Sequence, residues 1–190
     1  MPIFGRTPKK CFDEFRDAIA PLLTKCISLT AHLRLIRVND FERLLTIGEH
    51  GLKLDTVFGT LYLLVLQRLN VVEDKKHGYR LQTLAYAYRL QGTASRTESK
   101  PLLRWEYEKH QPRDTWPRNH MHAAATLSQN ESELDLNKLH LPTGWVTLEE
   151  VIRFAIHELG HAPPVGDQWW ELLVESERRF YTDFSGKGYS

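Results

Sequence analysis

The period of the apolar pattern changes along the chain. Over residues 11–25, apolar side chains recur at helical spacing, which predicts a helix that Pro21 kinks or splits. Over residues 27–35, apolar residues alternate with mostly polar ones, which predicts a strand. Residues 40–54 fit either a helical turn or part of a hairpin, with a turn at Gly51. The N-terminal part therefore predicts one helix followed by extended structure.

The middle of the chain has the period of two that is typical of strands. Residues 59–92 predict a long hairpin, and a polar loop follows up to residue 100. Residues 103–108 predict a strand that is apolar on one face and charged on the other. A loop with two prolines covers residues 110–118, and residues 120–127 predict the next strand.

The C-terminal part returns to helical spacing. Thr147, followed three residues later by Glu150, is a capping box that opens a helix ending near Leu159. A last helix is predicted over residues 168–183, with Asp167 as its cap. The whole pattern predicts an α+β fold, in which one antiparallel sheet carries an N-terminal helix and two C-terminal helices packed on it.

We expect one domain over residues 1–190, because this length fits a single core. Within it, residues 1–58 form an extension with the first helix and strand, and residues 59–127 form the sheet core. Residues 139–144 predict a turn before the C-terminal helices over 147–183.

Composition and charge limit the classes of function that the chain can have. The chain is 42% hydrophobic and 26% charged, as in an ordinary globular protein, and its net charge is +1. A nuclease would therefore need a local basic patch. The two cysteines, Cys11 and Cys26, imply no disulfide framework. No segment approaches the ~18 apolar residues of a membrane span, and residues 1–6 lack a signal peptide's apolar core, so we expect a cytoplasmic protein.

One histidine pair lies on the predicted strand over residues 120–127. His120 and His122 are two residues apart, so they share a face, and paired imidazoles can act as acid and base in metal-independent RNA cleavage. Arg104 on the neighbouring strand and His110 beside it complete the predicted catalytic set, without a metal or cofactor. The alternative is that both histidines are ordinary polar residues on the solvated face of a one-sided sheet, since a bare HxH is a weak motif. Three further cations in the adjoining loop are predicted to bind substrate: Lys109, Arg113 and Arg118.

A second histidine pair spells HExxH. On a helix, His157 and His161 would share a face and bind zinc, with Glu158 as base and Glu175 of the last helix as third ligand. The alternative is that Gly160 ends the helix, so that His161 has left it and no zinc site forms.

An ordered series of segments suggests a family. The segments are Gly59–Leu61, Tyr86–Gln91, Arg104–Tyr107, Trp116–His122 and Thr147–Val151. Together, residues 59–160 resemble the TumE-like toxins of bacterial toxin–antitoxin systems. The resemblance implies a small cytoplasmic protein encoded beside a helix-turn-helix antitoxin, and it treats residues 147–160 as a packing helix.

Three functional hypotheses follow. The first is the toxin component of a toxin–antitoxin or phage-defence system, whose partner is an antitoxin protein and whose activity, where it has one, is metal-independent cleavage of bound RNA. The second is a minimal HExxH zinc metallopeptidase. The third is a non-enzymatic protein-binding module, with Trp170 and Phe184 as its exposed aromatic residues.

Overall fold

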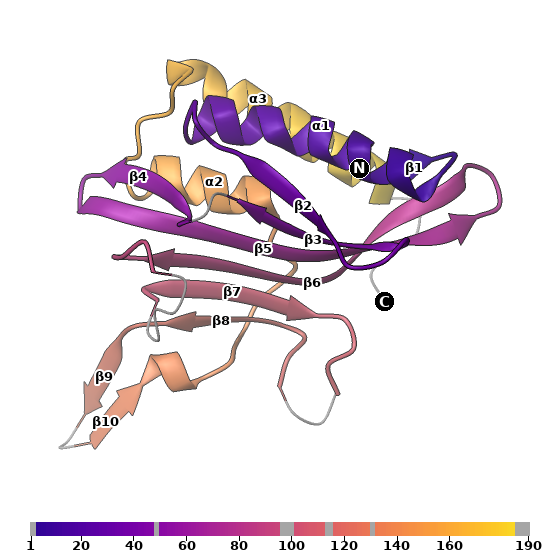
Figure 1. Cartoon of the computed structure of the whole chain (residues 1–190). Helices are drawn as coiled ribbons and strands as arrows, with labels where there is room; N and C mark the ends of the chain where they lie inside the picture. The colour runs from indigo at the N-terminus through magenta and orange to yellow at the C-terminus, as the bar shows by residue number, and fades with distance from the viewer. Residues whose placement is uncertain (1–2, 48–49, 96–100, 113–115, 130–131, 185–190) are drawn as a thin grey trace.

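A computed structural model describes residues 3–47, 50–95, 101–112, 116–129 and 132–184. It shows a large antiparallel sheet with the helices α1 (Pro8–Cys26), α2 (Leu148–His157) and α3 (Trp169–Phe184) on one side (Figure 1). The predicted α+β fold, with one N-terminal and two C-terminal helices on the sheet, is therefore confirmed.

Among the described residues, nine strands form one sheet. Their central order is β11-β8-β7-β6-β5-β3-β2, while β1 pairs with β6 and β4 with β5. A separate two-stranded sheet joins β9 to β10. The strands are β1 (Phe4–Gly5), β2 (Leu33–Arg37), β3 (Glu42–Ile47), β4 (Leu52–Thr56), β5 (Gly59–Asp74), β6 (Gly78–Gln91), β7 (Leu103–Glu108), β8 (Asn119–Ala123), β9 (Thr126–Gln129), β10 (Ser132–Asp135) and β11 (Leu141–Pro142). Short 3₁₀ helices follow β10 (η1, Leu136–Lys138) and precede α3 (η2, Gly166–Gln168).

The predicted hairpin over residues 59–92 is present as β5 and β6. The two strands pair from Tyr62 opposite Gln91 to Asp74 opposite Gly78, with one irregularity after Arg68. Gly78 adopts a φ of 90°, which favours glycine at the turn. These two long strands form the centre of the sheet.

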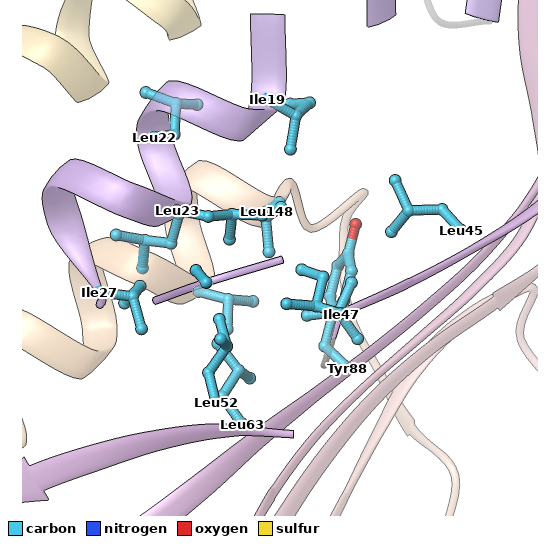
Figure 2. Close-up of a cluster of buried hydrophobic side chains, with 14 of the residues drawn as sticks. Ile19, Leu22, Leu23, Ile27, Leu45, Ile47, Leu52, Leu63, Tyr88 and Leu148 are labelled. Atoms are coloured by element: carbon cyan, nitrogen blue, oxygen red, sulfur yellow. The ribbon is translucent and has the colours of Figure 1, made fainter. Parts of the chain in front are cut away.

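Alternation along these strands buries one face against the helices. On that face, Tyr88 packs beside apolar side chains of α1, α2 and the neighbouring strands (Figure 2). Trp105 of β7 meets the ring of Phe154 of α2 edge-on, with centroids 5.6 Å apart. The hydroxyl of Tyr86 accepts a hydrogen bond of 2.9 Å from the backbone N–H of Val146, just before α2. The alternate residues of β6, β7 and β8 therefore lie on the opposite, helix-free face.

Two predicted segments differ from the structure, and a third, for which the sequence left two alternatives, is decided by it. Residues 27–32 are not a strand: the N–H of Ile27 bonds the Leu23 carbonyl (3.0 Å) at the end of α1, so only β2 is extended. Of the two alternatives for residues 40–54, the extended one is confirmed, since Glu42–Ile47 forms β3 and Leu52–Thr56 forms β4. Residues 120–127 are split, because a turn after Ala123 directs the chain into the separate β9–β10 hairpin.

The helical predictions are closer to the structure. Pro21 lies inside a helix that continues through it to Cys26. The Thr147–Glu150 capping box is present, with a bond of 3.1 Å from the Glu150 N–H to the Thr147 hydroxyl. Asp167 lies within η2, and α3 begins directly after η2, so the predicted cap is wrong.

The end of α2 is fixed by Gly160 and His161. Gly160 has a φ of 67°, and a Cβ there would lie 2.6 Å from Cγ1 of Val57. The following ring, His161, is buried. Its Nε2 lies 3.0 Å from the carbonyl oxygen of Ile27 and its Nδ1 3.4 Å from that of Asp55. The ring therefore joins the exit of α2 to the end of α1 and to β4.

Replacing this ring tests its structural role. His161→Ala removes a buried hydrogen-bonded side chain and should lower the free energy of unfolding by about 1–3 kcal/mol. The matched control is His157→Ala, whose side chain is 70% exposed; it should stay within about 0.5 kcal/mol of the original protein. Urea denaturation measures both, and equal losses in the two variants would contradict the assignment.

Candidate functional site

Three histidines meet on the helix-free face of the sheet. His120 and His122 project from β8, and His140 immediately precedes β11. Pairing of Leu141 with Met121 places His140 across from His122. One nitrogen from each ring lies within 4.8 Å of the others, and the ring centroids are 4.7–5.2 Å apart. We call these three residues the histidine cluster.

Backbone carbonyls fix the tautomers of the two strand histidines. Nδ1 of His120 lies 2.8 Å from the carbonyl oxygen of Pro117, and Nδ1 of His122 lies 3.0 Å from that of Asn137. Because a carbonyl can only accept, each Nδ1 carries the proton and donates it. When such a ring is neutral, its lone pair is therefore on Nε2. Nε2 of His122 is buried without a hydrogen-bond partner.

Burial also favours the neutral imidazole form of His122 and His140. The side chains of His120 and His122 are only 5% and 3% exposed. Desolvation, reinforced by the positive charge of Arg104, lowers the pKa of His122 below its ordinary value. Desolvation also lowers the pKa of His140, with a further contribution from His120. A neutral imidazole with a free lone pair is the form that binds a metal ion.

Glu106 and Arg104 of β7 lie beside the cluster. In the strand register, Glu106 is opposite His120 and Arg104 is opposite His122. Oε2 of Glu106 lies 3.4 Å from Nε2 of His120, 3.7 Å from Nε2 of His122 and 3.2 Å from Nε of Arg104. One carboxylate oxygen is thus placed between the imidazoles and the guanidinium.

The donor set fits a zinc-type metal ion. Zn–N bonds are about 2.0–2.1 Å, so a tetrahedral site needs ligand nitrogens roughly 3.3 Å apart. The nitrogens of the cluster, within 4.8 Å of one another, would have to approach by about 1.5 Å. Small rotations of the three side chains would bring the nitrogens this much closer. Three histidines leave the fourth position open, as in catalytic zinc sites.

The structure brings together only part of the predicted catalytic set. His120, His122 and Arg104 lie side by side, as expected. His110 is exposed in the turn after β7, where its N–H lies 3.4 Å from Oε1 of Glu108. In the described part of the chain, no contact joins His110 to the histidine cluster.

The structure describes two of the three cations that were predicted to bind substrate. Arg118 is exposed, and its carbonyl accepts the N–H of Glu108 (3.2 Å). The N–H of Lys109 bonds the Leu84 carbonyl (2.8 Å). Arg113 lies outside the described residues.

Two important residues were missed by the sequence analysis. Glu106 was visible on the polar face of its predicted strand, and only the register shows that it faces His120. His140 was placed in a turn, whereas the structure has a short edge strand, β11, directly after it. Trp116 stacks on His140, with centroids 4.7 Å apart and an interplanar angle of 20°.

The HExxH segment does not form a zinc site. His157 is the last residue of α2, where its Nδ1 lies 2.9 Å from Oε1 of Glu158 on the surface. His161 has left the helix and is held by backbone carbonyls, as described above. Glu175 of α3 pairs with Arg178 at 2.8 Å. The zinc-peptidase alternative is therefore wrong, because the two imidazoles do not share a helix face.

Of the two aromatic residues in the binding-module hypothesis, the structure shows the exposure of one. Trp170 is 49% exposed, and the guanidinium of Arg153 lies 5.0 Å from the centroid of its ring. The side chain of Phe184 lies outside the described part of the chain.

Comparisons with protein-family models, curated proteins and solved structures find no match to this chain. The resemblance to TumE-like toxins therefore stays a prediction. Within the described residues, no helix combines the length and the apolar character that a membrane crossing requires.

The lowered pKa values predict how stability depends on pH. In the unfolded chain, His122 and His140 return to the ordinary value of 6.5, so below this pH the unfolded state binds more protons than the folded state. The free energy of unfolding of metal-free protein should therefore be highest above about pH 7.5 and fall as the pH is lowered towards 5.

The control for this pH dependence is His122→Asn. The Asn amide can still donate to the Asn137 carbonyl, but it does not titrate. Urea denaturation between pH 8 and 5 should give a shallower decline for this variant. Identical pH slopes in the two proteins would contradict the assigned role of His122.

Proposed function

We propose that the protein is a hydrolase with a zinc-type divalent metal ion bound by His120, His122 and His140. The observation that supports this most directly is the orientation of the two buried strand histidines: each donates a hydrogen bond from Nδ1 to a backbone carbonyl, so the neutral ring offers the lone pair of Nε2 to a metal ion. Metal-binding histidines in proteins commonly have this second hydrogen bond, which orients the ring and raises its basicity.

The neighbouring residues fit hydrolysis. A bound metal ion of this kind supplies Lewis acidity and lowers the pKa of a coordinated water. Glu106, within 3.4 Å of the His120 Nε2, is placed to accept and hold a proton from water. Arg104 pairs with this carboxylate at 3.2 Å and orients it. Each residue therefore has a distinct role: three ligands, one base and one positioning cation.

Metal-independent RNA cleavage by the same histidines has weaker support. That chemistry needs one imidazole protonated near neutral pH, while the pKa of His122 is lowered by burial. The Glu106 carboxylate also occupies the space beside both Nε2 atoms, where it would repel a phosphate bound without a metal ion.

The toxin role remains part of the proposal as its biological setting. The Trp116–His122 segment on which the resemblance to TumE-like toxins partly rests contains the two strand ligands of the proposed centre. We infer that toxicity, relieved by an antitoxin partner, depends on this centre.

Metal binding is the first test. Purified protein should bind about one zinc ion per chain. His122→Asn and His140→Asn should each weaken zinc binding by on the order of 100-fold or more, since even outer-shell changes cost 10–100-fold. His157→Ala is the control and should bind zinc as the original protein does. Calorimetric titration measures these affinities, and zinc binding that depends on His157 alone would sink the proposal.

Growth of bacteria expressing the chain is the second test. Expression should slow growth, and Glu106→Gln should relieve this, because loss of a general base typically costs about 10²–10⁴ in rate. Glu106→Gln should still bind zinc, which separates loss of the base from loss of the metal. Full toxicity of this variant, or a harmless original protein, would contradict the toxin role.

A further inference from the structure

Two arginines lie side by side on the sheet, next to the histidine cluster. In the register, Arg89 of β6 is directly opposite Arg104 of β7, and Arg104 is directly opposite His122 of β8. All three side chains lie on the helix-free face, because their neighbours Tyr88, Trp105 and Met121 pack towards the helices. The two guanidiniums are therefore neighbours beside the proposed metal centre.

Two directly opposed arginines need an explanation. Like charges across a strand pair destabilise a sheet. Among the described residues, Arg89 has no hydrogen bond or ion pair. Two nearby charges of this face have partners: Arg68 pairs with Glu42, and Glu106 lies beside the histidines.

Arg104 also has spare hydrogen-bonding capacity. Its Nε lies 3.2 Å from Oε2 of Glu106, within ion-pair distance, yet the atom is buried without an aligned hydrogen bond. The buried Nε2 of His122, on the next strand, likewise has no hydrogen-bond partner. A buried donor left without a hydrogen bond is costly, so the Nε–H of Arg104 indicates a ligand that completes it.

We propose that Arg89 and Arg104 bind the phosphoryl group of a phosphate ester, which is the substrate of this centre. The inference rests on the proposed metal site. Planar guanidinium groups match the oxygens of phosphate with two parallel hydrogen bonds each. A phosphoryl group has enough oxygens to contact two arginines and the metal position together, whereas a carboxylate has only two.

The reaction is then hydrolysis of a P–O ester bond. Water oxygen bonds to phosphorus as the bond to the leaving oxygen breaks, and the leaving oxygen takes the electron pair of that bond. Glu106 accepts the proton that water loses and then gives it to the leaving oxygen, which becomes the hydroxyl of the alcohol product. Arg89 and Arg104 balance the negative charge that develops on the phosphoryl oxygens.

Inorganic phosphate is the probe for this site. Zinc-loaded protein should bind phosphate, and Arg89→Gln should weaken this binding about tenfold or more, the scale of a lost charge-assisted contact, without changing zinc affinity. The matched control is Arg34→Gln, an exposed arginine that register places on the same face but on the distant strand β2. It should bind phosphate within about twofold of the original protein.

The outcomes separate this inference from the metal proposal. Absence of zinc binding overturns the proposed function. Normal zinc binding, with equal phosphate affinity in Arg89→Gln and the original protein, overturns this inference alone. Acetate that binds at this site as tightly as phosphate also overturns it. Hydrolysis of bis(p-nitrophenyl) phosphate, with KM raised in Arg89→Gln and unchanged in Arg34→Gln, would support it. Hydrolysis of p-nitrophenyl acetate alone would contradict it.

Discussion

The alternation of side chains across β6, β7 and β8 is the constraint on which the rest of this structure depends. Tyr88, Trp105 and Met121 follow one another across the three strands and pack towards the helices. Because side chains alternate along each strand, their neighbours must face the other way. A shift of register by one residue would exchange the two faces, so the packing of the core fixes the position of the histidines.

The second constraint is that backbone carbonyls before and after β8 in the chain hold the rings of the two strand histidines. The Pro117 and Asn137 carbonyls hold the rings of His120 and His122, and Trp116 stacks on His140. Crowding three imidazoles here leaves at least one buried nitrogen unbonded, which a structure built for stability alone would avoid. The proposed metal ion would bond this nitrogen, which packing alone leaves without a partner.

The sequence predicted the elements that depend on local periodicity. The long hairpin over residues 59–92, the strand over 103–108 and the capped helix after Thr147 are present, because each has a clear period or a local cap. The shared face of His120 and His122 also followed from spacing alone. Gly160 predicted that His161 leaves the helix, and its φ of 67° confirms this.

The rest of the site could not be predicted, because it depends on pairing between strands that are separate in the sequence. His140 lies 18 residues beyond His122, and only the two-residue strand β11 brings them together. So short a strand has no measurable period. The role of Glu106 likewise depends on register between β7 and β8, which no pattern within either strand determines. The split after Ala123 was missed because residues 123–127 contain no glycine or proline to mark the turn that the backbone makes there.

The most direct measurement of the central claim is the X-ray absorption spectrum of the zinc-loaded protein at the zinc edge. The account predicts three imidazole nitrogens at about 2.0–2.1 Å with a fourth light-atom ligand, and loss of one imidazole in His140→Asn. A sulfur shell at about 2.3 Å, which would implicate Cys11 or Cys26, would contradict it, and so would a spectrum without imidazole scattering.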